Sequence, residues 1–88
     1  MACYLISYDL VGPDRDYDSL IDAIKEYGTW AKITESFWAV VTEQKAKDIR
    51  ANLKQHLDSD DIIFVVKSGT QAAWSNVRCS NEWLKRHL

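Results

Sequence analysis

Two strand-like runs between residues 29 and 42 constrain the fold more than any other feature of the sequence. Thr29 to Ile33 and Phe37 to Thr42 are rich in β-branched and aromatic residues, which favour extended backbone. Only Thr34-Glu35-Ser36 separates the two runs. A connection this short joins neighbouring strands as an antiparallel hairpin, so the fold has to be built around that hairpin.

Helical periodicity lies on both sides of the hairpin. Before it, apolar residues recur at three- and four-residue spacing from Tyr17 to Tyr27, and Gly28 is placed to end the helix. Asp16 and Asp18 favour the positive N-terminal end of this helix. After the hairpin, the same spacing runs from Gln44 to Leu57.

Strand-like runs also lie at the outer ends of this pattern. Cys3 to Asp9 predicts a first strand, closed by the turn-forming run 11–16, and Ile62 to Lys67 predicts a last strand. Residues 70–77 favour no element, and Ser80 can cap a final short helix over Asn81 to His87. The order is β-α-β-β-α-β plus a C-terminal tail. We expect a single α+β domain over residues 1–88, a ferredoxin-like sandwich with both main helices on one face of an antiparallel sheet.

The composition fits a globular protein that does not cross a membrane. Hydrophobic residues make up 47% of the 88 residues and charged residues 27%, which excludes a disordered chain. Apolar runs are far shorter than the roughly 18 residues of a membrane span, and the N-terminus lacks the basic region of a signal peptide. We therefore expect a cytoplasmic protein in which Cys3 and Cys79 are reduced thiols.

The last strand and the second hairpin strand are apolar on both faces. Every residue from Ile62 to Val66 is apolar, and so is every residue from Phe37 to Val41. A sheet with helices on one face should instead alternate apolar and polar residues, so the other face is too hydrophobic to lie in water. The tail could cover it only in part. We expect a homodimer, with an interface that includes Leu5, Trp38 and Val40.

Residues spread along the whole chain also match the pattern of a known family. With this spacing the chain resembles the small bacterial proteins labelled SinR-like, and more distantly the small CRISPR-associated endoribonuclease subunit and virulence-associated protein D. The matching residues are Tyr8-Asp9-Leu10, Ala23-Ile24-Lys25, Gly28-Thr29-Trp30, Ser36-Phe37-Trp38-Ala39-Val40, Ile49-Arg50, Asp58, Asp61, Trp83-Leu84-Lys85 and His87-Leu88.

The resemblance implies a ferredoxin-like fold, a symmetric dimer and a role for Asp9. In the CRISPR-associated relatives, the aspartate that ends the first strand lies near the two-fold axis. It is the proposed ligand for a magnesium ion used in phosphodiester cleavage. Those relatives carry arginines along the first helix, whereas this helix has Asp18, Asp22 and Glu26. Nucleic acid is therefore not expected to bind across that helix.

Two interpretations of Asp9 remain open. One is a Mg²⁺ ligand and catalytic residue, since hard cations bind carboxylates and activate water next to phosphate. One carboxylate is a weak site, but a two-fold axis could bring two Asp9 side chains within about 6 Å. The other is that Asp9 only orders the turn that follows it.

The remaining candidates favour ordinary structural roles. The run 58–61 lacks the ligand spacing of a calcium loop and is expected to be a solvated turn. Lys47, Arg50 and Lys54 form a basic stripe that could bind RNA or DNA phosphates, although such stripes are common on surface helices. Tryptophans are expected in the core or the dimer interface rather than as platforms for nucleic-acid bases.

The sequence thus supports two functional hypotheses. The first is a homodimeric, Mg²⁺-dependent endoribonuclease or other nuclease that uses Asp9. The second is a dimeric scaffold without catalytic activity that binds a protein or nucleic-acid partner. The overall charge of -2 favours the second hypothesis, and the position of Asp9 favours the first.

Overall fold

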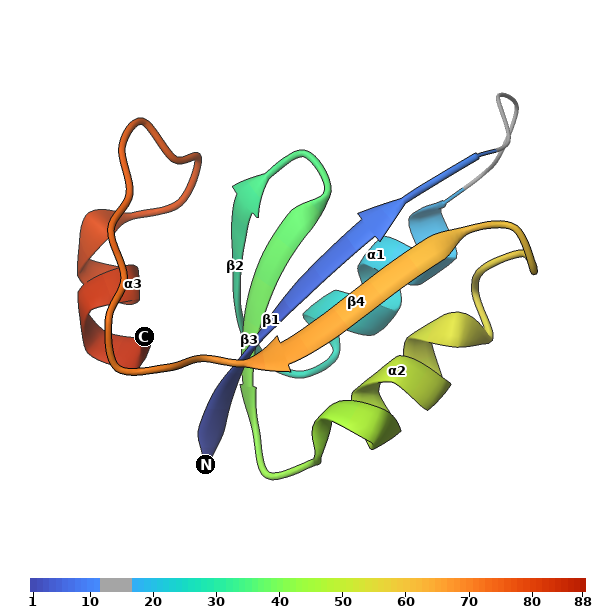
Figure 1. Cartoon of the computed structure of the whole chain (residues 1–88), viewed down its shortest axis with the longest axis horizontal. Coiled ribbons are helices and arrows are strands. Elements are labelled where there is room, and N and C mark those ends of the chain that lie inside the picture. The colour runs from blue at the N-terminus through green and yellow to red at the C-terminus, as the bar shows by residue number, and fades with distance from the viewer. Residues whose placement is uncertain (12–16) are drawn as a thin grey trace.

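In the computed structural model, residues 1–11 and 17–88 are described, and they form one four-stranded antiparallel sheet with three helices (Figure 1). The strand order across the sheet is β2-β3-β1-β4, so β1 and β3 are central. The strands are β1 (Ala2–Asp9), β2 (Thr29–Thr34), β3 (Phe37–Thr42) and β4 (Ile62–Lys67), and the helices are α1 (Asp18–Lys25), α2 (Ala46–Lys54) and α3 (Asn81–His87).

The α+β class and the order of the elements predicted from the sequence are confirmed. The bounds of β3, β4 and α3 agree with the predicted ranges, whereas α2 is shorter than predicted. His56 N–H donates to the Leu53 carbonyl and Leu57 N–H to the Lys54 carbonyl, so the last predicted turn is a tightened i→i+3 turn. The predicted turn at 11–16 and the capping role of Asp16 lie outside the described residues, apart from Val11.

The first hydrophobic cluster lies between the sheet and the helices α1 and α2. We call this side of the sheet the inner face. Strand alternation sends the even-numbered residues of β1 and β3 toward it, and Leu20, Ile24, Ile49 and Leu53 meet them from the helices. Trp38 is 1% exposed and is the largest fully buried side chain in the described part of the chain. Gly28 ends the turn after α1 with a φ of 88°, a conformation that glycine adopts readily.

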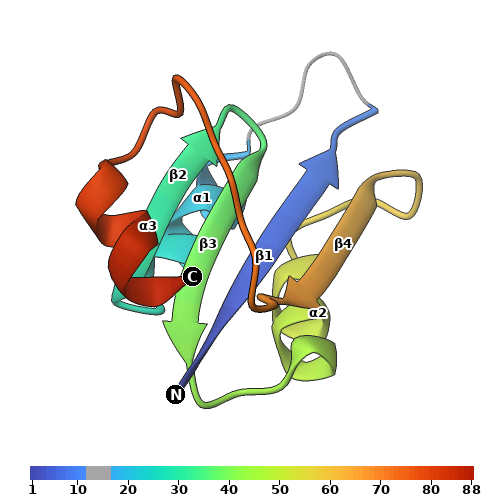
Figure 2. The ribbon, with the colours of Figure 1, turned by 60° about the vertical axis from the view of Figure 1, so that its left-hand side comes forward.

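A second, smaller cluster covers part of the opposite side, the outer face. Leu84 of α3 packs there with Cys3, Ile33 and Ala39, and half-buried residues of the segment before α3 join the cluster. The Ser80 side chain accepts a hydrogen bond from Trp83 N–H and caps α3 as predicted. Figure 2 shows α3 in front of β2 and β3, with α1 behind the sheet.

The cover on the outer face does not reach β4. Ile62, Phe64 and Val66 are 56%, 55% and 45% exposed, respectively, and we call these three residues the β4 stripe. Figures 1 and 2 show α3 at the β2 side of the molecule, away from β4. The sequence argument for an outer face that is too apolar for water therefore applies to β4.

Two further expectations concern the cysteines and membranes. Cys3 and Cys79 are both free thiols that pack in or against the second cluster. Burial raises the pKa of the Cys3 thiol. Among the residues that the structure describes, none of the helices has the length and apolar character needed to span a bilayer.

Candidate functional site

Asp9 ends β1 on the outer face of the sheet. Its side chain is exposed, and it stands beside Ile62 in the ladder that joins β1 to β4. Ser7, also exposed, stands beside Phe64 in the same ladder. The carboxylate predicted from the sequence to be functional is therefore next to the exposed β4 stripe.

The described part of one chain does not provide a metal site around Asp9. Across residues 1–11 and 17–88, no three His, Cys, Asp or Glu side chains are grouped closely enough to hold a metal ion. Mg²⁺ prefers several oxygen ligands, and one exposed carboxylate holds it weakly. The described residues of a single chain therefore do not fit a bound Mg²⁺ ion.

The acidic turn between α2 and β4 has a clear structural role. One carboxylate oxygen of Asp61 accepts from Asp58 N–H at 2.9 Å, and the other accepts from Val11 N–H at 3.0 Å. Asp61 N–H in turn donates to the Asp58 carbonyl at 3.1 Å. These bonds order the turn and join it to the chain that follows β1, and this agrees with the predicted turn rather than with a calcium loop.

The three basic residues considered for nucleic-acid binding are all exposed on α2. Lys47, Arg50 and Lys54 follow helical spacing, so they lie toward one side of the helix, away from buried Ile49 and Leu53. Their position leaves them accessible to phosphates, and binding at this stripe stays a prediction.

The predicted dimer interface needs a correction. Trp38 and Val40 are 1% and 0% exposed in the inner-face cluster, so they cannot contact a second subunit. Leu5 pairs with Ala39, and alternation therefore puts Leu5 on the outer face while Trp38 and Val40 point to the inner face. Because β3 is apolar on both faces, its sequence does not indicate which side chains face outward.

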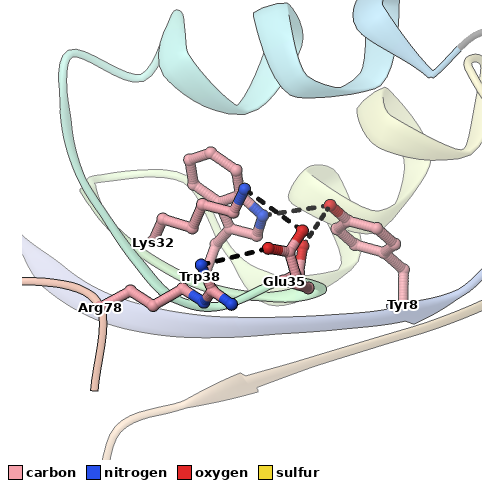
Figure 3. A network of polar contacts seen from close by, with 5 residues as sticks. All are labelled: Tyr8, Lys32, Glu35, Trp38 and Arg78. Atoms are coloured by element: carbon pink, nitrogen blue, oxygen red, sulfur yellow. Dashed lines mark hydrogen bonds and ion pairs between the residues drawn. The ribbon is translucent and has the colours of Figure 1, made fainter. Parts of the chain in front are cut away.

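A polar network that the sequence did not indicate surrounds the hairpin turn between β2 and β3 (Figure 3). The indole N–H of Trp38 donates to the hydroxyl of Tyr8 at 3.1 Å, within the core. That hydroxyl donates to the backbone carbonyl of Glu35 at 3.4 Å. The core is thus joined to the turn by a chain of hydrogen bonds that satisfies the polar atoms of both buried rings.

The Glu35 side chain continues this network at the surface. Its carboxylate lies 3.7 Å from the Lys32 ammonium and 3.3 Å from the Arg78 guanidinium. Arg78 N–H also donates to the Ile33 carbonyl at 3.0 Å, which fixes the segment before α3 to the edge strand β2. Figure 3 shows Lys32 and Arg78 both directed toward Glu35.

Tyr8 does not have the properties of a general base or nucleophile. Burial raises the pKa of the Tyr8 hydroxyl, the hydrogen bond from Trp38 lowers it, and the nearby Glu35 carboxylate raises it; the net direction is upward. The hydroxyl therefore keeps its proton at neutral pH and acts as a hydrogen-bond donor and acceptor.

The comparisons with known proteins do not narrow the function. No protein-family model matches the chain, and no curated protein matches it at a significant level. The resemblance to SinR-like and CRISPR-associated proteins therefore remains an expectation from sequence. The function is therefore inferred from the residues around Asp9, β4 and the β2 edge.

Proposed function

We propose that the protein works as a homodimer in which two copies pair through the outer face of β1 and β4. The observation that carries this proposal is the β4 stripe, in which three neighbouring large apolar side chains are about half exposed. Leu5 and Phe37 are half-buried on the same face and extend the surface toward the second cluster. Contiguous apolar surface of this kind marks an interaction site on a small protein.

A second copy suits this surface because the surface is complementary to itself. Ile62, Phe64 and Val66 follow one another on the outer side of β4, and Asp9 lies beside Ile62 at one end. A two-fold axis near Phe64 would align the two stripes antiparallel, with Ile62 against Val66 of the other copy. The two apolar stripes would then cover each other along their length.

The proposed fold class is the ferredoxin-like arrangement. It is supported by the β-α-β-β-α-β order of the first six elements and by the strand order β2-β3-β1-β4. In this order, β3 lies between β1 and β2, and β1 lies between β3 and β4, as in two split βαβ units. A cytoplasmic location stays part of the proposal, and the two free thiols agree with it.

The proposed activity is Mg²⁺-dependent cleavage of RNA or DNA phosphodiesters. It requires a two-fold axis nearer to Ile62, which would bring the two Asp9 carboxylates together. A Mg²⁺ ion held by them would activate water and neutralise phosphate charge. Because residues 1–11 and 17–88 of one chain lack a group of such ligands, the proposed activity depends on the dimer.

The alternative is a dimeric scaffold without catalytic activity. One observation favours it: the described residues of one chain have no cluster of three metal ligands. In this case Asp9 performs no chemistry. The position of the two-fold axis separates the two functions.

Cross-linking would locate the axis. We would compare Asp9→Cys with Phe64→Cys, both in a Cys79→Ser background that leaves only buried Cys3, and treat them with a short bis-maleimide. Efficient dimer cross-linking through position 9 favours the nuclease, and cross-linking through position 64 alone favours the scaffold. If neither position cross-links, the outer face is not the interface.

A cleavage assay would test the chemistry directly. Labelled RNA and DNA would be incubated with and without Mg²⁺, using wild type, Asp9→Asn and the control Asp60→Asn, which removes a nearby exposed carboxylate. The nuclease proposal expects Mg²⁺-dependent cleavage that Asp9→Asn abolishes and Asp60→Asn retains. Undiminished cleavage by Asp9→Asn would remove Asp9 from the mechanism, and no cleavage on any substrate would favour the scaffold.

Light scattering would test the dimer independently of any activity. Wild type at micromolar concentration should have about twice the chain mass of 10.2 kDa, and Phe64→Asp should have the mass of one chain because it puts a charge into the apolar interface. A wild-type protein that is monomeric throughout would contradict the proposal.

A further inference from the structure

Strand β4 forms one edge of the sheet, because the strand order is β2-β3-β1-β4 and β4 pairs only with β1 in the described part of the chain. The opposite edge is partly occupied, since the Ile33 carbonyl of β2 accepts from Arg78 N–H at 3.0 Å. An uncovered edge strand presents backbone groups with which another extended chain can pair. The edge of β4 is therefore a candidate interaction surface.

The backbone groups that point outward from β4 follow from the alternation along a strand. Ser68 N–H donates to the Cys3 carbonyl at 2.8 Å, so the even-numbered residues of this stretch direct their backbone groups toward β1. The N–H and C=O groups of Ile63, Val65 and Lys67 consequently point away from β1. Each of these residues supplies one donor and one acceptor, which is sufficient for a short ladder with a further strand.

The two sides of this edge differ in chemistry. On the outer face, the β4 stripe is about half exposed and offers apolar contacts along the strand. On the inner face, α2 packs against β4, whereas α1 packs against β2. Figure 1 shows α2 running alongside β4. An added strand would therefore have the apolar stripe beside one of its faces and helix α2 beside the other.

The side of α2 that flanks this edge is basic. Asn52 donates to the Tyr27 hydroxyl at 3.0 Å, so the Asn52 side of α2 faces the end of α1. Successive residues are about 100° apart around a helix, so Arg50 and Lys54, each two positions from Asn52, point about 160° away from it. Lys47 points about 140° away from Asn52 by the same geometry. All three cations are exposed, and they lie on the side of α2 directed away from α1 and toward the edge of β4.

We propose that the edge of β4 binds an extended peptide in which apolar and acidic residues alternate. The peptide pairs with the backbone of Ile63, Val65 and Lys67 and adds a strand to the sheet, antiparallel to β4 as are all neighbouring strands here. Its apolar side chains lie on the outer face beside the β4 stripe. Its acidic side chains lie on the inner face beside Lys67, Arg50 and Lys54, where opposite charges attract.

The charge of α2 argues against a second copy at this edge. Two β4 strands paired edge to edge would place two α2 helices side by side with their basic sides facing, and like charges would repel. A nucleic acid would attract the same cations, but it has no peptide groups to pair with the edge. The inference goes beyond the proposed function, because it uses the edge of β4 and requires neither Asp9, Mg²⁺ nor a dimer.

The test is fluorescence anisotropy with a labelled peptide of about eight residues that alternates valine and glutamate, at low salt. A peptide of the same composition, with its valines and glutamates in separate blocks, should bind at least about ten-fold more weakly because it cannot segregate them onto opposite faces. A peptide that alternates valine and lysine should not bind. Equal affinity for the alternating and block peptides, or no binding by the alternating peptide, would overturn the proposal.

Backbone methylation distinguishes strand pairing from simple charge attraction. In antiparallel pairing, the glutamates stand opposite Ile63, Val65 and Lys67, so the glutamate N–H groups face β4 and the valine N–H groups face away. Methylation of the glutamate nitrogens should weaken binding about ten-fold or more, whereas methylation of the valine nitrogens should change it by about three-fold or less. Equal losses for the two methylated peptides would contradict pairing at this edge.

Matched substitutions test the cations. Arg50→Gln/Lys54→Gln should weaken binding about ten-fold and reduce its salt dependence, whereas Lys85→Gln/Arg86→Gln on α3 should bind within about two-fold of wild type. Val65→Pro removes an outward N–H without removing a bond to β1, and it should also weaken binding; circular dichroism would verify that it is folded. If the α2 and α3 double variants bind equally well, the basic side of α2 does not contact the peptide.

Competition determines the class of partner. The unlabelled alternating peptide should displace the probe, and oligo(U) with the same number of negative charges should not. Equal displacement by oligo(U) would assign the cations of α2 to phosphates and overturn the peptide assignment. Peptide binding, the mass of the protein in solution and cleavage are separate measurements. A failure at the edge of β4 is therefore distinct from a failure of the outer-face dimer or of the Asp9 chemistry.

Discussion

The two faces of the sheet are covered in different ways. On the inner face, α1 and α2 each connect strands of the same sheet, so the connections themselves hold both helices against it. On the outer face, the cover is a terminal segment that is fixed by the docking of Leu84, the cap at Ser80 and the bond from Arg78 to β2. The comparison explains why the exposed apolar stripe lies at the limit of the outer cover.

This difference predicts different responses to substitution. A change in the inner cluster should lower the stability of the whole domain. A change in the outer cluster should loosen mainly the C-terminal segment, because that segment contacts the rest of the protein through few residues. A change in the β4 stripe should hardly affect an isolated chain.

The largest effect is expected for Trp38→Ala. Trp38 is 1% exposed and fills the centre of the inner cluster, so its removal leaves a large cavity and a Tyr8 hydroxyl without its donor. We expect the free energy of unfolding to fall by about 3–5 kcal/mol, measured by urea denaturation. Tyr8→Phe keeps the ring but removes the hydroxyl, and it should lower the stability less, by about 1–3 kcal/mol. Equal effects would mean that the hydrogen bond rather than the packing dominates.

The next effect is expected for Leu84→Ala. Leu84 is 1% exposed and is the only residue of α3 that is fully buried, so the change removes the main contact of the helix. The local loss should be about 2–5 kcal/mol, enough to open the segment in a large fraction of molecules. Hydrogen–deuterium exchange should become fast in α3 and at Arg78 while β1 and β3 keep their protection. Lys85→Ala, an exposed neighbour, is the control; uniform loss of protection throughout the sheet would contradict separate covers.

A smaller effect is expected for Ser80→Ala. The side chain of Ser80 caps α3 by accepting from Trp83 N–H at 3.1 Å. Loss of such a cap lowers helix stability by about 1 kcal/mol. Exchange should accelerate in α3 alone, without a measurable change in β1. Ser75→Ala, in the exposed segment before α3, should change neither region.

The sequence predicted much of the inner face and little of the outer face. Helical period, the capping residue Ser80 and the short hairpin connection are local signals, and they gave correct element types and mostly correct bounds. Leu5, Trp38 and Val40 were all expected at the interface, and this was wrong for Trp38 and Val40 because β3 is apolar at successive positions. Only the pairing register, in which Leu5 opposes Ala39, decides which side faces out.

The attachment of the C-terminal segment to the hairpin could not be predicted because it depends on long-range contacts. Trp30 and Trp83 were expected in the core or at a dimer interface, and residues 70–77 matched no element. The contact between Arg78 and Glu35 joins two loops without a spacing pattern that would pair them. The charged residues were visible in the sequence, but the contact between Arg78 and Glu35 was not.

The smallest effect on an isolated chain, and the sharpest test of the comparison, is expected for Phe64→Ser. Phe64 is 55% exposed, and substitutions at such surface positions change stability by about 0.5 kcal/mol or less. Unfolding should therefore match wild type in dilute solution. If two copies pair through the β4 stripe, however, the wild-type unfolding midpoint should rise with protein concentration, because association stabilises the folded state.

Phe64→Ser should abolish this concentration dependence, whereas Val11→Ser, at a 59% exposed position outside the sheet, should retain it. A wild-type midpoint that is independent of concentration would mean that the stripe remains in water and that the outer face needs no second copy. A concentration dependence that survives in Phe64→Ser would place the contact elsewhere. Only the combination of a dependent wild type and an independent Phe64→Ser variant identifies the outer face as the surface through which this protein associates.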